Sequence, residues 1–167
     1  MPEAAAGLSR NSLLAELRAH LEAQLESVES AQKASQDGAT HEETRAEDPK
    51  DMRSTEASYL ARGLAERVAQ LREAIARLGS FACADDASFA CVQAGALVGV
   101  ENEEGALAVH LFVPAGGGVT LGAAELPVHS LSASSPLGAE LLGRSPHEEV
   151  EIELPGGVES LYIAWVR

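Results

Sequence analysis

Two stretches in the first half of the chain carry apolar residues at the spacing of an amphipathic helix. In the first, which starts after Asn11, the apolar residues follow one another at steps of three and four. In the second, from Ala57 to Leu78, leucines recur every seventh residue, as in a coiled coil. Asn11 is a candidate N-cap, and Gly79 stands where a residue at the C′ position is expected. The two apolar seams consist of Leu14, Leu17, Leu21, Leu25 and Val28, and of Leu60, Leu64, Val68, Leu71, Ile75 and Leu78.

One helix alone cannot bury either seam, so the pattern favours an antiparallel helical hairpin. The first helix is expected to end near Gln36, because Asp37-Gly38 is a typical interruption. With arms of about 20–25 residues, the hairpin would be about 30–38 Å long. Residues 37–55 then form its tip, a segment rich in carboxylates with almost nothing apolar. A solvated loop is one interpretation of this acidic segment, and a functional tip presented by the hairpin is the other.

After Gly79 the pattern changes to short apolar segments separated by Gly, Pro or acidic turns, which is typical of strands. A helix is predicted only from Pro136 to Leu142, with Ser135 as its N-cap and Gly143 at its end. Gly116-Gly117-Gly118 predicts a flexible turn, since no GK[ST] follows it as in a phosphate loop. The expected strands are 96–100, 106–113, 119–121, 150–154 and 160–166, with hairpin turns at 101–105 and 155–157.

The predicted fold class is therefore α+β, with a domain boundary near Gly79. Residues 1–79 are expected to form an N-terminal antiparallel α-helical hairpin (coiled coil). Residues 80–167 are expected to form a small antiparallel β domain with one short helix. The charge supports this division, because residues 1–79 hold ten Lys and Arg against fourteen Asp and Glu, while residues 80–167 hold two against twelve.

The net charge of −14 argues against direct binding along a nucleic-acid groove, which needs clustered Lys and Arg. Cys83 and Cys91 lack a metal-binding spacing, and His41-Glu42-Glu43 is not followed by the second His of a zinc-protease motif. The sequence has no apolar run of signal-peptide or membrane-spanning length. We therefore expect a reduced, cytoplasmic protein. A monomer is expected, although the leucine seam leaves a dimer open.

Two segments of the second half resemble the C-terminal signature of the Gre transcript-cleavage factors (GreA and GreB). In that family, a Ser-Pro helix ends in Leu-Leu/Ile-Gly-Lys/Arg. The matching segment here is Ser135-Pro136-Leu137-Gly138-Ala139-Glu140-Leu141-Leu142-Gly143-Arg144. The strand and Pro-Gly-Gly turn that follow are matched by Glu149 to Gly157. Gly95-Ala96-Leu97-Val98 and Leu131-Ser132 resemble two further family motifs, so the resemblance covers most of residues 92–166.

The resemblance implies an FKBP-like β domain that docks on RNA polymerase, with Ser132, Ser135 and Pro136 as partner-binding residues. It also implies a hairpin that enters the secondary channel of the polymerase. The two acidic residues of the family's tip correspond to Asp48 and Asp51, and the tyrosine that follows them corresponds to Tyr59. Asp48 and Asp51 would then act as catalytic and metal-binding residues for Mg²⁺ shared with the polymerase active site. The nascent RNA 3′ end would be contacted only within the polymerase complex.

Three functions remain open from the sequence. The first is a transcription elongation factor that stimulates the polymerase's own cleavage of backtracked RNA and is not itself an enzyme. The second is a regulator or inhibitor that occupies the channel without stimulating cleavage, because Asp51 replaces the family's Glu and Pro49 separates the two acids. The third is a general interaction module with other partners.

Overall fold

The computed structural model describes residues 7–43, 52–122, 126–154 and 157–167. It confirms the α+β class, with a helical hairpin followed by a six-stranded sheet and one short helix. The chain forms two compact units. We call residues 20–76 the helical unit, and residues 1–19 together with 77–167 the β unit.

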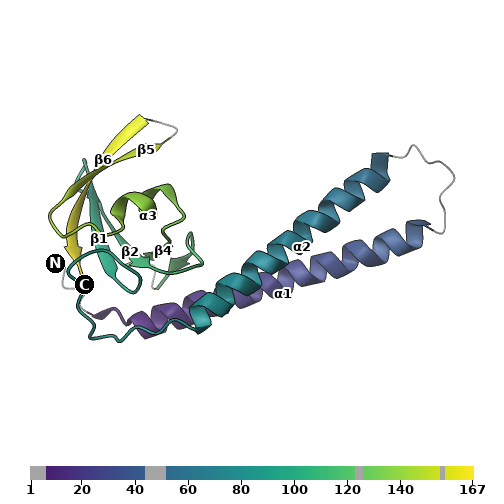
Figure 1. Cartoon of the computed structure of the whole chain (residues 1–167), viewed down its shortest axis with the longest axis horizontal. Coiled ribbons are helices and arrows are strands. Elements are labelled where there is room, and N and C mark those ends of the chain that lie inside the picture. The colour runs from purple at the N-terminus through teal and green to yellow at the C-terminus, as the bar shows by residue number, and fades with distance from the viewer. Residues whose placement is uncertain (1–6, 44–51, 123–125, 155–156) are drawn as a thin grey trace. The chain divides into compact units, whose positions relative to one another are not determined.

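The hairpin consists of helices α1 (Arg10–Glu43) and α2 (Met52–Gly79), which run side by side in Figure 1. Within the helical unit, Leu21, Val68 and Leu71 of the predicted seams are buried. Polar bonds also join the helices there, and the Nη2 atom of Arg72 lies 2.6 Å from the Oε1 atom of Glu29. Both of these side chains are largely exposed, so the apolar seam contributes more to the pairing than the ion pair does.

Both helices extend beyond the ends that the apolar pattern predicts. The prediction that Asp37-Gly38 ends α1 is wrong, because the helix continues to Glu43. Residues that favour helices, chiefly Ala, Gln and Glu, surround this pair, and one Gly in a helix costs only about 1 kcal/mol. The N-cap prediction is also wrong, since the Ser9 hydroxyl, not Asn11, accepts the N–H of Ser12 at 3.1 Å.

The sheet has the strand order β3-β4-β2-β1-β6-β5 and is mixed. Neighbouring strands are antiparallel except β2 and β4, which pair in parallel after the chain has passed through β3. Strand β4 was not expected from the sequence, because its four residues include a His and a Ser and show no clear alternation. The strands are β1 (Leu97–Asn102), β2 (Leu107–Phe112), β3 (Thr120–Leu121), β4 (Val128–Leu131), β5 (Glu149–Leu154) and β6 (Gly157–Val166).

The predicted hairpins are present. Strands β1 and β2 are joined through the turn at Asn102–Gly105, where Gly105 has a positive φ of 77°. Strands β5 and β6 pair in antiparallel fashion from Leu154 and Gly157 outward. Both connections therefore lie where turn residues interrupt the apolar segments.

The β unit buries apolar residues on both faces of its sheet. One cluster joins the sheet to helix α3 (Pro136–Leu141) and contains Val98, Val100, Phe112, Leu131, Leu141, Val150 and Ile163. Residues that alternate with these along the strands, such as Leu97 and Leu111, are buried as well. The first turns of α1 belong to this unit. The Glu16 carboxylate accepts the N–H of Gly122 at 3.0 Å, and Leu17 is fully buried.

Arg10, the first residue of α1, joins the helix to the segment that follows α2. Its side chain is completely buried and donates hydrogen bonds to the carbonyls of Gly95 (2.9 Å), Ala87 (3.0 Å), Ala84 (3.4 Å) and Asp85. Its guanidinium carbon lies 5.4 Å from the centre of the Phe89 ring. Sequence reasoning did not single out this residue, because an Arg at a helix start is ordinarily solvated.

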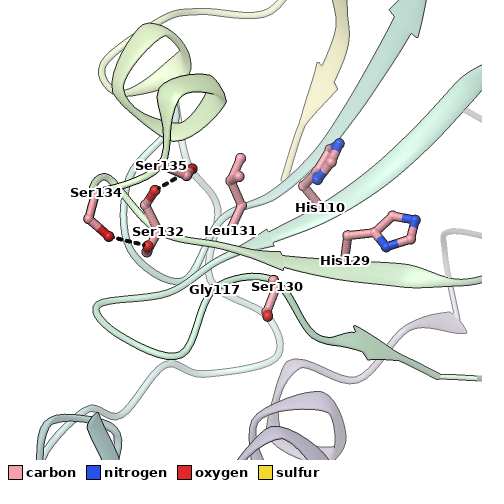
Figure 2. Close-up of a pocket in the computed structure, with 9 residues that line it drawn as sticks. His110, Gly117, His129, Ser130, Leu131, Ser132, Ser134 and Ser135 are labelled. Atoms are coloured by element: carbon pink, nitrogen blue, oxygen red, sulfur yellow. Dashed lines mark hydrogen bonds between the residues drawn. The ribbon is translucent and has the colours of Figure 1, made fainter. Parts of the chain in front are cut away.

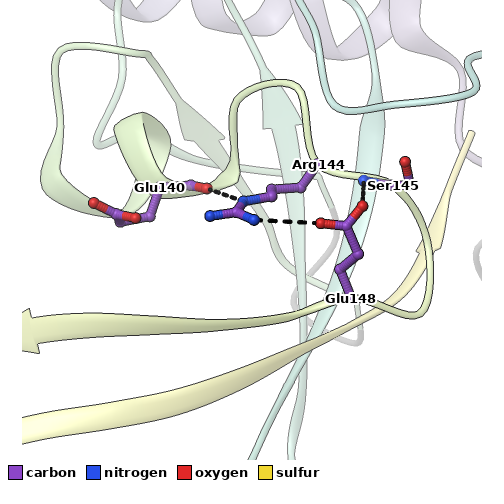
Figure 3. A network of polar contacts seen from close by, with 4 residues as sticks. All are labelled: Glu140, Arg144, Ser145 and Glu148. Carbon is purple, nitrogen blue, oxygen red and sulfur yellow. Dashed lines mark hydrogen bonds and ion pairs between the residues drawn. The ribbon is translucent and has the colours of Figure 1, made fainter.

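A polar network closes the loop between α3 and β5 (Figure 3). The Glu148 carboxylate accepts the backbone N–H of Ser145 at 3.0 Å and lies 3.5 Å from the Nη1 atom of Arg144. The hydrogen bond from Ser145, followed by the contact with Arg144, holds the pKa of Glu148 below its usual range. Arg144 also donates from Nε to the carbonyl of Glu140 in α3, so the network links the helix to the following strand.

Candidate functional site

The two predicted tip carboxylates, Asp48 and Asp51, lie in residues 44–51, outside the described part of the chain. Their assignment as catalytic and metal-binding residues stays a prediction. On the described side of the tip, α2 exposes two large apolar residues, Tyr59 (70%) and Leu60 (57%). Tyr59, which corresponds to the family's tyrosine, is therefore accessible on the helix surface.

The partner-binding residues predicted on the β unit lie at the start of α3. Ser135 caps the helix in an extended conformation, and its hydroxyl accepts the N–H of Gly138 at 3.0 Å. The same hydroxyl donates to the carbonyl of Ser132 at 2.9 Å, and Pro136 occupies the first helical turn. These contacts confirm the predicted helix and bring Ser132, Ser135 and Pro136 together. Their role in binding a partner stays a prediction.

Gly138 allows this close packing. A Cβ atom at this position would lie 1.9 Å from the carbonyl oxygen of Ser132. The Ser-Pro-Leu-Gly segment therefore needs its glycine because the backbone of residue 132 lies against the first turn of α3.

An open pocket with a volume of about 400 Å³ lies beside this helix start (Figure 2). We call it the Ser–His pocket. Ser132 and Ser135 contribute to it, but Pro136 does not. Its full lining is His110, Gly117, Gly118, His129, Ser130, Leu131, Ser132, Ser134 and Ser135.

The glycine segment predicted as a flexible turn is held in place by Ser130. The Ser130 hydroxyl donates to the carbonyl of Gly116 at 2.7 Å and accepts the N–H of Val119 at 2.9 Å. A Cβ atom at Gly117 would lie 2.9 Å from the Ser132 hydroxyl, so the loop packs directly on β4 and its end. Gly116 and Gly118 have positive φ angles of 81° and 90°, which glycine adopts without strain.

Most hydroxyl groups of the pocket already have partners. Besides the bonds of Ser130 and Ser135, the Ser132 and Ser134 hydroxyl oxygens lie 2.8 Å apart. None of them is placed beside a base that would activate it as a nucleophile among the described residues. The described residues also contain no group of three or more His, Cys, Asp or Glu that could hold a metal ion.

The two histidines of the pocket, His110 and His129, lie far apart in the sequence, and no sequence pattern connects them. His110 on β2 and His129 on β4 are partners in the parallel register, and their ring centres lie 5.8 Å apart. His110 is only 9% exposed, and its Nδ1 atom has no hydrogen-bond partner among the described residues. Nothing in the sequence indicated strand β4, and only the pairing of β4 with β2 brings the two rings together.

The buried His110 predicts that stability falls in mild acid. Burial, together with the nearby His129, lowers the pKa of His110 from 6.5 to about 4. Below pH 6.5 the unfolded chain therefore takes up a proton that the folded chain does not accept until about pH 4. As the pH falls from 6.5 to about 4, the free energy of unfolding should drop by on the order of 3 kcal/mol. Above pH 6.5 this group should not change the free energy of unfolding.

Urea unfolding between pH 4 and pH 7.5 measures this effect. The variant His110→Gln should lose the part of the pH dependence of the free energy of unfolding that comes from His110. The variant His147→Gln, which replaces a histidine hydrogen-bonded to Tyr162, should keep it. The same pH dependence for wild type and His110→Gln would contradict the prediction.

In the described part of the chain, no helix combines the length and the apolar content needed to cross a membrane. The sequence matches no protein-family model and no curated protein.

Three solved structures are similar in fold. Gfh1 from Thermus aquaticus has a TM-score of 0.40 and 19% identity, over 89% of this chain and 92% of that one. Gfh1, GreA factor homolog 1, from Thermus thermophilus has a TM-score of 0.37 and 17% identity, over 90% and 94%. The transcription elongation factor GreA/GreB from Nitrosomonas europaea has a TM-score of 0.38 and 23% identity, over 57% and 78%. Gfh1 and GreA/GreB are thus structural neighbours over most of the chain, at low sequence identity.

Proposed function

We propose that this chain is a Gre-type accessory factor of RNA polymerase. The hairpin enters the secondary channel, and the β unit docks at the channel rim through the start of α3. Asp48 and Asp51 then stimulate the polymerase's own cleavage of backtracked RNA. The observation that carries the proposal is the segment Ser135–Arg144, which resembles the Gre signature in sequence and folds as a helix capped by its own serine.

The lengths of the helices fit this proposal. Helix α1 has 34 residues and α2 has 28. At a rise of 1.5 Å per residue they are about 51 Å and 42 Å long. Asp48 and Asp51 stand in sequence between Glu43, the last residue of α1, and Met52, the first residue of α2.

The chemistry of the tip follows from its oxygen ligands. Mg²⁺ prefers one or two protein carboxylates together with water and phosphate oxygens, and it can stabilise the attacking and leaving oxygens of a phosphodiester. Asp48 and Asp51 would supply carboxylate oxygens and orient a water molecule. Because the remaining ligands belong to the polymerase and the RNA, the chain alone is expected to cleave nothing.

A second function has its own support in the tip sequence. A shorter Asp stands at position 51 where the resemblance expects Glu, and Pro49 lies between the two acids. A carboxylate with the shorter side chain reaches less far. The hairpin would then occupy the channel and slow nucleotide addition without stimulating cleavage.

RNA cleavage by a stalled, backtracked polymerase complex tests both functions. The wild-type chain is expected to speed cleavage, and Asp48→Asn/Asp51→Asn should lower that stimulation more than about tenfold, because it removes two metal ligands. Asp37→Asn is the matched control, since it removes an exposed carboxylate of α1 and should leave cleavage unchanged.

The outcomes separate the three alternatives. Slowed nucleotide addition without cleavage would support the channel-occupying regulator. If the immobilised chain retains no polymerase at moderate salt, both polymerase functions fail and a general interaction module remains.

A further inference from the structure

His110 and His129 stand in the same register on neighbouring parallel strands, so their side chains leave the same face of the sheet. Both line the open Ser–His pocket. A Zn²⁺–N bond is about 2.0–2.1 Å long, so two imidazoles on one tetrahedral ion have ring centres about 5.2 Å apart. The observed ring centres are 5.8 Å apart, which is near the spacing that one shared ion requires.

Each ring can offer a nitrogen lone pair. The Nδ1 atom of His129 lies 3.2 Å from the Thr120 hydroxyl, and donation of its proton there leaves Nε2 free to bind a ligand. A neutral imidazole always has one nitrogen without a proton, and the Nδ1 atom of His110 has no hydrogen-bond partner among the described residues.

We propose that His110 and His129 form a two-imidazole site for a divalent transition-metal ion such as Zn²⁺ or Cu²⁺, with Thr120 as the residue that positions His129. Imidazole suits these ions, whereas Mg²⁺ and Ca²⁺ prefer oxygen ligands. The pocket is open, and no third His, Cys, Asp or Glu completes the set among the described residues. The remaining coordination positions are therefore filled by water or by an external ligand, and the site binds exchangeably. This site is separate from the proposed tip chemistry and does not depend on it.

Titration of the full chain, without a histidine tag, with ZnCl₂ in a calorimeter tests this site. We expect saturable binding of one equivalent, which His129→Gln should weaken more than about tenfold. Thr120→Val should weaken it less, because it removes only the orienting hydroxyl. The matched controls are His147→Gln and His41→Gln, which should bind Zn²⁺ as the wild type does. The His41 variant also tests whether the acidic tip binds the ion instead.

A spectroscopic measurement keeps the test valid if a substitution disturbs the fold. One equivalent of Cu²⁺ bound to the wild-type chain should give an electron paramagnetic resonance spectrum with coupling to two imidazole nitrogens, and His110→Gln should reduce this to one. The proposal is overturned if Zn²⁺ does not bind, if His129→Gln binds it unchanged, if Mg²⁺ displaces it at equal concentration, or if the copper spectrum shows only oxygen ligands.

Discussion

Replacing Gly138 by alanine should lower the free energy of unfolding by about 3 kcal/mol or more. The new Cβ would lie 1.9 Å from the carbonyl oxygen of Ser132 and 2.7 Å from its carbonyl carbon. This neighbour cannot yield easily, because it is backbone that accepts hydrogen bonds from the N–H of Ser135 (3.1 Å) and from the Ser135 hydroxyl (2.9 Å). Relief of the clash must move α3 away from residue 132 and break these bonds.

Urea unfolding followed by the fluorescence of Trp165 measures this loss, since it is the only tryptophan and lies in the β unit. Gly79→Ala is the matched control, because a Cβ there meets nothing closer than 3.9 Å and the backbone is helical. Its free energy of unfolding should stay within about 1 kcal/mol of the wild type. A Gly138→Ala chain as stable as the control would show that residue 132 does not pack against α3 in this way.

Replacing Arg10 by alanine should lower the free energy of unfolding by about 3–5 kcal/mol. The guanidinium is fully buried and bonds four carbonyls of the segment from Ala84 to Gly95. Without it, the carbonyls of Asp85 and Ala87 lose their one described donor, and a cavity remains beside Phe89. The carbonyl of Ala84 keeps the N–H of Ala87 at 3.1 Å, and that of Gly95 keeps a weak contact with the Cys83 thiol at 3.8 Å. Arg10→Lys should lose less, because it keeps the charge, but one ammonium group cannot reach four carbonyls in a fork.

The same fluorescence measurement applies, because Arg10 and Trp165 belong to the β unit. Arg77→Ala removes an exposed guanidinium from the same unit and should change the stability by less than about 0.5 kcal/mol. If Arg10→Lys were as stable as the wild type, the positive charge alone would account for the contribution of Arg10, and the fork of hydrogen bonds would not.

These two predictions concern the scaffold of the proposed docking surface. Gly138 keeps Ser132 and Ser135 together, and Arg10 holds the segment that leads into β1. A variant at either position that fails to bind polymerase would therefore report on folding. Substitutions of Ser134, which is exposed and bonded only to the Ser132 hydroxyl among the described contacts, are better suited to testing the surface itself.

The elements with local signals could be predicted from the sequence. The leucine repeat predicted the hairpin, and Ser135, Pro136 and Gly143 marked α3 to within one residue. The turn residues at 101–105 placed the β1–β2 hairpin. In each of these cases capping, helical periodicity or turn geometry acts within a few residues, so the signal can be recognised in the sequence.

Contacts between residues far apart in sequence became visible only in the folded chain. Arg10 bonds Gly95 across 85 positions, and no local pattern indicates that an Arg at a helix start is buried. The parallel pairing of β2 with β4 joins His110 to His129, although β4 carries no alternating pattern of its own. Long-range packing supplies the free energy for such elements, so a short strand and a buried polar residue become recognisable only when their partners are in place.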